Sequence, residues 1–357
     1  MSTAVNKRRV PLIAWAGVVL GILFALFVYP APLNTLQPHF DGACRAIAMD
    51  ASAEDLSIDR ARGVAYLSYL DRTRPTAGAR QPGGTVMLVD LNVAQPRVRA
   101  ALVTDPPNFR PSGISLYVPE HGPRRLFVVN RTVSGPHSIE MFEQTATGAF
   151  VSVESIRDPL LLSPNAIVAV GPRQFYVAND AGLEGRFARL TELLFRRARS
   201  SVLYYDGDRM NIAATRLQMA TGITASADAR TVFVSEAAGR RLHIFDRNID
   251  TGALRTREVV ALGTAPNNLS VAEDGSVWIA AHPRLLAILR NLNDASVRSP
   301  TQVLKFTPGP GSVARVSEIY LNGGDEISAG SAAATRGKQF VVGSVTDRKL
   351  LLCGPPK

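Results

Sequence analysis

The chain is poor in the residues that build most catalytic and metal centres. Its 357 residues include two cysteines and five histidines. The cysteines, Cys44 and Cys353, are too far apart in sequence for a CxxC metal site. No Gly-x-Ser-x-Gly elbow occurs, which argues against a serine hydrolase, and no glycine-rich phosphate loop is present. Zinc-finger, helix-turn-helix and aromatic-plus-basic RNA motifs are missing too, so we expect no nucleic-acid partner.

The charge is unbalanced toward the positive side. Forty lysines and arginines face 30 aspartates and glutamates, which gives a net charge of +10. An excess of this size favours anionic surfaces. Since no nucleic-acid motif accompanies it, a membrane lipid surface is the expected partner.

One uncharged run, from Val10 to Tyr29, is long enough to cross a membrane. As a helix it would span about 30 Å. The preceding basic residues, Lys7 to Arg9, place the N-terminus on the cytoplasmic side and export the rest. The alternative is a cleaved signal peptide, but the small-x-small pattern of a cleavage site is missing near the end of the run. We expect an uncleaved signal-anchor over residues 1–30, a linker over 31–43 and an extracytoplasmic (periplasmic or extracellular) globular part over 44–357.

The two cysteines lie near opposite ends of this exported part. In an exported chain such an even pair suggests a disulfide that ties the termini together. The alternative is two buried free thiols.

The rest of the chain consists of short β-rich runs between turn residues, and it repeats one layout. A polar residue is followed by one further residue and an aliphatic one, then by a turn and an alternating strand. The units begin at Glu54, Ser112, Asn165, Thr221, Asn267 and, more weakly, Ser331. Periods near 50 residues with several strands per unit are typical of propeller blades. We expect an all-β fold, a six-bladed β-propeller, because a β-sandwich would not repeat this signature.

The repeat also predicts a site. The innermost strand of each blade begins beside the central channel, so the six polar side chains, together with Asn268, should meet there. Oxygen groups that include the carboxylate of Glu54 resemble the shell preferred by Ca²⁺, and the absence of histidine and cysteine argues against zinc or copper. Ordered water filling the tunnel is the alternative. We favour one Ca²⁺ ion, because the Glu54 carboxylate would otherwise be buried and unpaired.

The same segments resemble the paraoxonase/arylesterase family, calcium-dependent lactonases related to gluconolactonase and strictosidine-synthase-like propellers. The resemblance covers nearly the whole chain after the anchor, and both cysteines match the family's terminal disulfide. The most specific segments are Ala53-Glu-Asp-Leu, Pro111-Ser-Gly-Ile-Ser, Asn165-Ala-Ile-Val-Ala-Val-Gly-Pro, Tyr176-Val-Ala-Asn-Asp, Asn267-Asn-Leu-Ser-Val and Ala281-His-Pro.

The resemblance implies a catalytic calcium held by Glu54, Asn165, Thr221, Asn267 and Asn268. Thr221 stands where the family has asparagine and Asn267 where it has aspartate, so the set keeps one carboxylate instead of two. Fewer ligand charges should weaken calcium binding.

A second, structural calcium of the family would use Asp55 and the backbone carbonyl of Ile114. Ala166 stands in place of its remaining aspartate, so we expect this second ion to be absent or weak.

The histidine pair proposed as the family's general base is missing. Ser112 and Arg131 stand at those positions, and neither is a good base at neutral pH. His282 matches a histidine of the pocket wall and could accept a proton, although a strand-end histidine is more often packed or solvated. Ser112 and His282 are the two candidate catalytic residues.

One stretch, about 183–199, has the periodicity of a helix. Its apolar residues, Leu183, Phe187, Leu190 and Leu194, recur at helical spacing, and arginines cover the other faces. We expect a basic amphipathic insertion over the mouth of the site, lying on acidic headgroups. The alternative is a lid packed on the propeller.

Two functional hypotheses follow. The first is a calcium-dependent hydrolase of small hydrophobic esters or lactones at the outer face of a membrane, with the metal polarising the carbonyl while water attacks. The second is a catalytically weak or inactive propeller that binds a ligand or a protein. The retained axial residues favour the first hypothesis, and the lost histidines and aspartate favour the second.

Overall fold

The computed structural model describes residues 36–73, 83–133, 135–183, 191, 192, 195, 197–309 and 315–355, with three isolated residues near the N-terminus. Residues 1–35 form a unit separate from residues 36–357, and the fold below is that of the second unit. The expected signal-anchor and most of the expected helix at 183–199 lie outside the described residues. No helix in the described part of the chain is long and apolar enough to cross a membrane.

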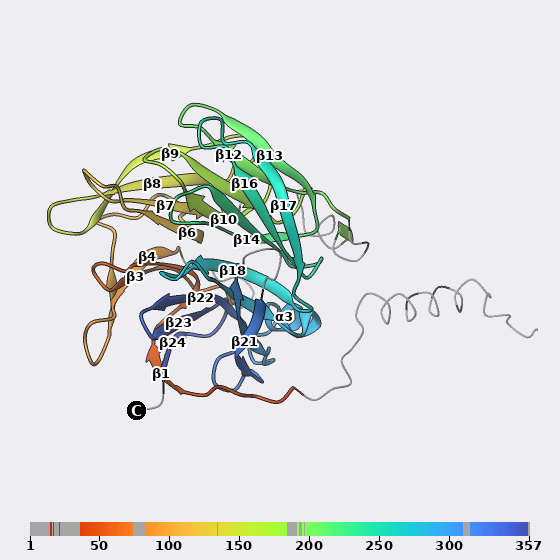
Figure 1. Cartoon of the computed structure of the whole chain (residues 1–357). Coiled ribbons are helices and arrows are strands. Elements are labelled where there is room, and N and C mark those ends of the chain that lie inside the picture. The colour runs from red at the N-terminus through yellow and green to blue at the C-terminus, as the bar shows by residue number, and fades with distance from the viewer. Residues whose placement is uncertain are drawn as a thin grey trace, which may run out of the picture. The chain divides into compact units, whose positions relative to one another are not determined.

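Antiparallel sheets of consecutive strands make up the fold (Figure 1). The first four-stranded sheet contains β6 (Pro111–Tyr117), β7 (Arg125–Asn130), β8 (Ser138–Gln144) and β9 (Phe150–Ile156). The second contains β10 (Pro164–Ala169), β11 (Phe175–Asn179), β12 (Ser200–Tyr205) and β13 (Met210–Leu217). The third contains β14 (Ala220–Ala225), β15 (Thr231–Glu236), β16 (Arg241–Arg247) and β17 (Leu254–Ala261). The fourth contains β18 (Ala265–Val271), β19 (Val277–His282), β20 (Thr301–Thr307) and β21 (Arg315–Asn322).

A further, eight-stranded sheet consists of two halves. One half contains β2 (Ser52–Asp59), β3 (Val64–Leu70), β4 (Thr85–Asp90) and β5 (Val98–Ala100). The other contains β22 (Gly330–Arg336), β23 (Gln339–Ser344), β24 (Lys349–Gly354) and β1 (Ala43–Ala48). A single pair, Ala53 opposite Ser344, joins β2 to β23.

The first strands of these units contact one another in a closed cycle, in the order β2, β6, β10, β14, β18, β22 and back to β2. A cycle of inner strands is the arrangement of a propeller, and the expected all-β fold is confirmed. The number of six blades stays a prediction, because one sheet unites two four-stranded halves.

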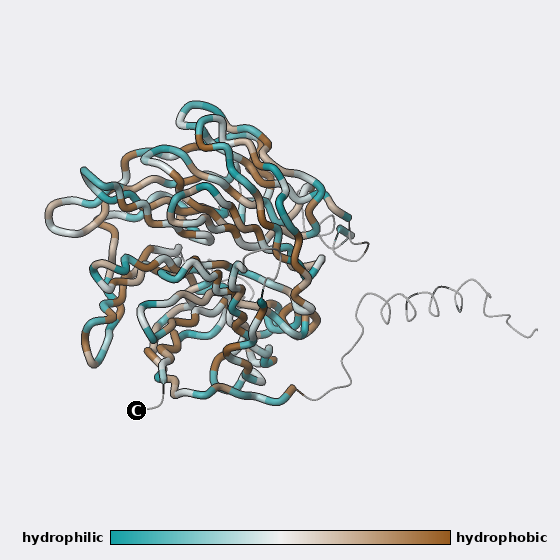
Figure 2. Tube along the Cα trace, viewed as in Figure 1, coloured by the Kyte–Doolittle hydropathy of each residue, from teal (hydrophilic) through white to brown (hydrophobic). Residues whose placement is uncertain are grey.

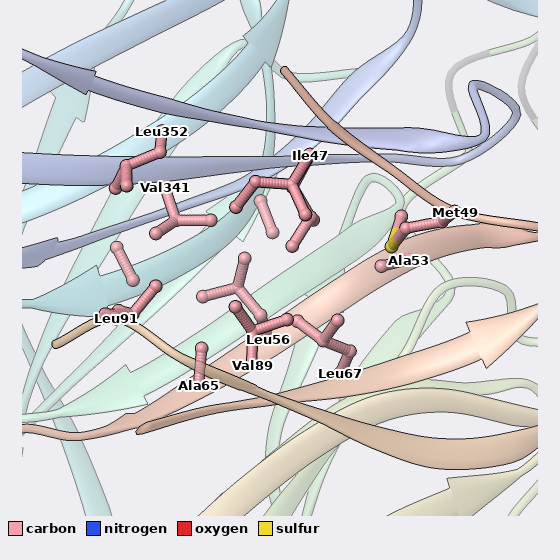
Figure 3. Packing of buried hydrophobic residues seen from close by; sticks show 13 residues of the cluster. Ile47, Met49, Ala53, Leu56, Ala65, Leu67, Val89, Leu91, Val341 and Leu352 are labelled. Carbon is pink, nitrogen blue, oxygen red and sulfur yellow. The ribbon is translucent and has the colours of Figure 1, made fainter. Parts of the chain in front are cut away.

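Hydrophobic residues fill the spaces between adjacent sheets, and Figure 2 shows brown hydrophobic stretches running along the strands. On β3, Ala65 and Leu67 face the cluster drawn in Figure 3, which also includes Ile47 and Leu352. Tyr66, between them, faces a second cluster with Leu126 and other residues of the neighbouring sheet. Since the strand is buried on both faces, its sequence reads as nearly continuous apolar residues.

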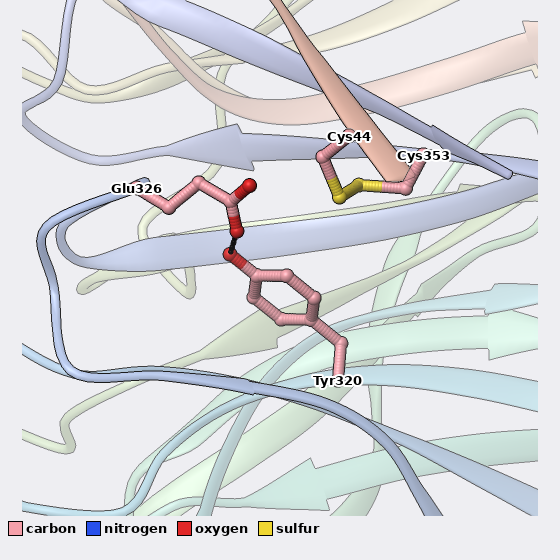
Figure 4. The surroundings of a disulfide bond; sticks show 4 residues. All are labelled: Cys44, Tyr320, Glu326 and Cys353. Carbon is pink, nitrogen blue, oxygen red and sulfur yellow. Dashed lines mark hydrogen bonds between the residues drawn. A yellow bond between two sulfur atoms is a disulfide. The ribbon is translucent and has the colours of Figure 1, made fainter. Parts of the chain in front are cut away.

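The strand β1 completes the last half-sheet by pairing with β24, and this register places Cys44 opposite Cys353. The two form a disulfide across 309 positions of sequence (Figure 4). The predicted disulfide is therefore confirmed. Nearby, the Tyr320 hydroxyl donates a hydrogen bond to Glu326 at 2.6 Å.

Replacing Cys44 with serine should lower the free energy of unfolding by about 2–5 kcal/mol, because the disulfide restricts the unfolded chain across a very long loop. Chemical denaturation without reductant measures the change. The Cys353→Ser variant and the double variant should match the single variant. A double variant with wild-type stability would show that the disulfide contributes nothing.

Candidate functional site

A pocket of about 590 Å³ lies where the inner strands begin. Five predicted blade-start residues line it, namely Glu54, Ser112, Asn165, Thr221 and Asn267. The sixth, Ser331, donates a hydrogen bond to the Glu54 carbonyl at 2.6 Å, and Asn268 donates to the same carbonyl at 3.1 Å. The structure therefore brings together the side chains that the repeat singled out.

A register irregularity at the start of every inner strand turns these side chains toward the axis. The shifts lie between Ala53 and Leu56, Pro111 and Ile114, Pro164 and Ala166, Ala220 and Gly222, Pro266 and Leu269, and Gly330 and Ala332. A β-bulge re-aims a side chain and ends regular pairing. The polar residue in each repeat thus marks the bulge, and the ladder resumes one or two residues after it.

Most of these polar side chains bind the backbone of the next inner strand. Ser112 donates to the Asn165 carbonyl at 3.0 Å, and Thr221 donates to the Pro266 carbonyl at 3.0 Å. Between them, the Asn165 amide donates to the Thr221 carbonyl at 2.6 Å. The Ser112 hydroxyl is thereby committed to a structural hydrogen bond, and its contact with Glu54 is long, at 3.5 Å. No group here activates it as a nucleophile.

The inner strands approach so closely that two glycines are required. A Cβ at Gly113 would lie 2.5 Å from Cα of Ala166, and one at Gly222 would lie 2.2 Å from the Asn267 carbonyl oxygen. Both are backbone atoms that cannot move aside cheaply. The glycine after the polar residue therefore fixes the distance between neighbouring inner strands.

The carboxylate of Glu54 is paired with an arginine that the sequence analysis did not single out. Nε of Arg72 lies 2.8 Å from Oε2 of Glu54. The same guanidinium donates to the carbonyls of Leu70 and Pro111. Burial lowers the pKa of Arg72, while Glu54 opposes that shift. Arg72 follows the end of β3, outside the repeated motif, so no sequence pattern linked it to Glu54.

A second arginine, Arg131, binds the side-chain oxygen of Asn165 at 2.8 Å and a carboxylate oxygen of Asp180 at 2.9 Å. It also donates to the Ser163 hydroxyl at 3.2 Å. Burial disfavours its charge, but Asp180 and Glu54 outweigh this effect and raise the pKa of Arg131. Arg131 is therefore a permanent cation and cannot be a base, as its residue type predicts.

His282 lies in the pocket wall as a neutral side chain. Its burial lowers the pKa to about 4. Nε2 lies 3.1 Å from Nδ2 of Asn267, and Nδ1 is buried with no hydrogen-bond partner among the described residues. With Asn267 donating to Nε2, the ring carries its proton on Nδ1 and has one donor left for a ligand.

Asp55, a candidate for the second calcium, accepts hydrogen bonds from the backbone N–H groups of Leu56 at 2.9 Å and Ile114 at 3.0 Å. Burial raises its pKa to about 7, although both hydrogen bonds oppose the shift. Ile114 thus contacts this carboxyl group through its N–H. Within the described residues, no three His, Cys, Asp or Glu side chains form a metal-binding group.

The axial residues fit a calcium ion poorly. The side-chain oxygens of Asn267 and Asn268 are buried without a hydrogen-bond donor, which would suit a cation. However, Glu54 and Asn165 already accept from guanidinium groups. An ion bound to Glu54 would lie within about 5 Å of Arg72, since Ca–O bonds are about 2.4 Å long. That repulsion offsets part of the attraction between the ion and the carboxylate.

Part of the pocket lining is apolar. It includes Leu285, Ile288 and Leu289 of the short helix α3 (Leu285–Asn291) and the adjoining Leu292. The sequence does not predict this helix, because seven residues are too few for a clear helical period. The pocket therefore combines a cationic side, with Arg72, Arg110 and Arg131, and an apolar side.

Several known proteins resemble this chain over most of its length. The family model described as Arylesterase matches residues 46–354. Human serum paraoxonase/lactonase 3 is 28% identical over 319 residues, which cover 85% of this chain and 86% of the relative. Human serum paraoxonase/arylesterase 1 is 27% identical, with 93% of this chain and 97% of the relative covered.

Among solved structures, a gluconolactonase from Xanthomonas campestris superposes with a TM-score of 0.54 at 13% identity. The match covers 91% of this chain and 99% of that one. At this identity the likeness shows the fold alone.

Replacing Gly222 with alanine should destabilise the protein by about 1–3 kcal/mol, because the new methyl group meets backbone on the next inner strand. Thermal or chemical unfolding measures the loss. Gly323→Ala is the matched control, since its Cβ would meet only the end of an aspartate side chain at 3.7 Å. Equal stability of the two variants would contradict the close approach of the inner strands.

Proposed function

The chain belongs to the arylesterase family, and on that premise we propose that it hydrolyses carboxylic esters or lactones in the axial pocket. The observation that carries this proposal is the composition of the pocket. A cationic side, an apolar side and a neutral imidazole line the same cavity.

The pocket suits a small, largely hydrophobic substrate with one polar reacting group. The leucines and isoleucine at α3 offer contact to an acyl chain or ring, and the volume of about 590 Å³ matches a small-molecule site. The carbonyl group of an ester or lactone would face the arginines.

Hydrolysis places negative charge on the carbonyl oxygen in the transition state. Fixed positive groups aimed at that charge in a partly buried pocket lower the barrier. The guanidinium of Arg131, held by Asp180 and Asn165, is permanently charged and oriented before substrate arrives. It therefore supplies the electrostatic stabilisation, while a water molecule from the pocket attacks.

His282 supplies the uncharged polar group. In the arrangement with Asn267, its Nδ1–H is a donor without a partner among the described residues, beside the pocket. The role of proton acceptor, expected from the sequence, requires the other tautomer and stays a prediction.

Calcium at the axis, which the family resemblance implies, also stays a prediction. Because the guanidinium contacts of Glu54 and Asn165 do not fit a divalent cation, we assign no step to a metal. Ser112 likewise receives no catalytic step, since its hydroxyl binds a backbone carbonyl.

The proposal extends to location. The uncharged run at residues 10–29, with basic residues before it, supports a membrane anchor with an extracytoplasmic catalytic part. The disulfide agrees with an oxidising compartment. The net charge of +10 supports contact with acidic lipid.

The direct test measures turnover of phenyl acetate and a series of aliphatic lactones by the full chain in detergent micelles. Turnover of at least one class above the buffer rate is expected. If the folded chain binds these compounds without hydrolysing them, the ligand-binding alternative replaces the hydrolase.

Replacing His282 with glutamine should lower kcat by about 100-fold, since removing one preorganised hydrogen-bond donor costs roughly 10²–10³-fold. The melting temperature checks that the variant is folded. His39→Gln is the control, because His39 lies outside the pocket and pairs with Glu318 on the surface. An unchanged kcat in His282→Gln would remove the imidazole from the mechanism.

A further inference from the structure

The only carboxylate among the five axial candidates is bound by a side chain of the same protein. We propose that the guanidinium of Arg72 takes the place of a metal cation at the axis, so that the site is complete without calcium. The proposal deepens the proposed function by naming the cation that pairs with Glu54 at the axis. The hydrolysis measurements below rest on the proposed function, whereas the measurements of calcium content and melting temperature do not.

Arg72 makes the connections that an axial ion would make. Its Nε binds Glu54 on β2, and its Nη2 binds the Pro111 carbonyl on β6. Nη1 reaches the Leu70 carbonyl at 3.3 Å and the Ser52 hydroxyl at 3.4 Å. One guanidinium therefore draws together the starts of two neighbouring inner strands, with its own strand end as the third support.

Arg131 binds a second candidate calcium ligand, Asn165, in the same way. It connects Asn165 on β10 with Asp180, while Ser163 holds its other nitrogen. Two of the five candidate ligands, Glu54 and Asn165, thus already contact a cation. Thr221 is committed too, since its hydroxyl donates to the Pro266 carbonyl.

The charges of this cluster balance without a metal. Two carboxylates, Glu54 and Asp180, pair with two guanidiniums, those of Arg72 and Arg131. A divalent ion would add two more positive charges to a buried site that is already neutral. Calcium sites need the opposite balance, because affinity rises with the negative charge of the ligands.

The two oxygens that remain, on Asn267 and Asn268, are uncharged acceptors. Their amide nitrogens are fixed by His282 and by the Glu54 carbonyl. A neutral acceptor needs only a water molecule or a substrate donor, whereas a buried carboxylate needs a cation. Arg72 is the cation for the Glu54 carboxylate, and water or substrate in the pocket can donate to the two asparagine oxygens.

The experiment measures calcium content and thermal unfolding of the full chain in detergent. After dialysis against calcium-free buffer, the wild type should contain far less than one calcium per chain. Its melting temperature and its ester or lactone hydrolysis should be unchanged by EDTA or by added calcium. One tightly held calcium per chain, or a melting temperature that falls with EDTA, overturns the proposal whether or not any substrate is hydrolysed.

Variants test whether calcium can replace the guanidinium of Arg72 as the partner of Glu54. Arg72→Met should lower the melting temperature, and millimolar calcium should restore part of the loss, because the freed Glu54 carboxylate becomes available to a ligand of the folded state. Arg125→Met is the matched control. It frees Glu143 from an ion pair away from the pocket, and calcium should not restore its stability.

A double variant guards against a single variant that fails to fold. Glu54→Gln alone leaves a buried guanidinium without its carboxylate, so it should be destabilised. Adding Arg72→Met to Glu54→Gln should recover a substantial part of that loss, because the pair then has no charge. If the two losses simply add, Arg72 is not the partner that neutralises Glu54, and the proposal is wrong.

Discussion

The site depends on one constraint, the hydrogen bonds that link the starts of neighbouring inner strands. A cycle of sheets leaves the ends of its innermost strands facing a narrow channel, where backbone carbonyls lack ladder partners. Ser112, Asn165, Thr221 and Ser331 supply donors to the carbonyls of neighbouring inner strands. The recurring polar residue is therefore first a structural element, and the pocket exists because these links hold the strand ends together.

The charged groups held by these inner strands determine the chemistry that the pocket can support. Glu54 is partly buried beside Arg72, and Asp180 is partly buried beside Arg131, so each carboxylate has a guanidinium partner. The arginines also give the pocket cationic groups, and the leucines beside α3 line the same pocket. The same ion pairs thus stabilise the fold and prepare the electrostatic field that ester hydrolysis requires. Because the ion pairs serve both purposes, a site without the family's histidine pair can still have a positive electrostatic potential where the carbonyl group of the substrate binds.

The sequence predicted the features that recur in every repeat and those that depend on a rare residue type, cysteine. The six polar positions identified the inner strands and the pocket, because each marks a bulge with the same local pattern. The two cysteines identified the disulfide, because two cysteines allow only one pairing. Arg72 could not be found in this way, since its contact with Glu54 depends on the path of a long side chain at a strand end. Helix α3 escaped because it is shorter than two full periods of a helical pattern. The residues proposed as an anchor and as a basic lid lie almost wholly outside the described part of the chain, so those predictions stand untested.

The pairing of β1 with β24 has a consequence for how the chain reaches its fold. The last half-sheet needs strands from both ends of the globular part, and its disulfide joins positions 309 residues apart. A nascent chain that has not yet exposed β24 leaves the β1 strand without a partner and the cycle of sheets open. Native contacts of such large sequence separation make folding slow. The unpaired edges then persist, and during biosynthesis they are the surfaces most exposed to aggregation.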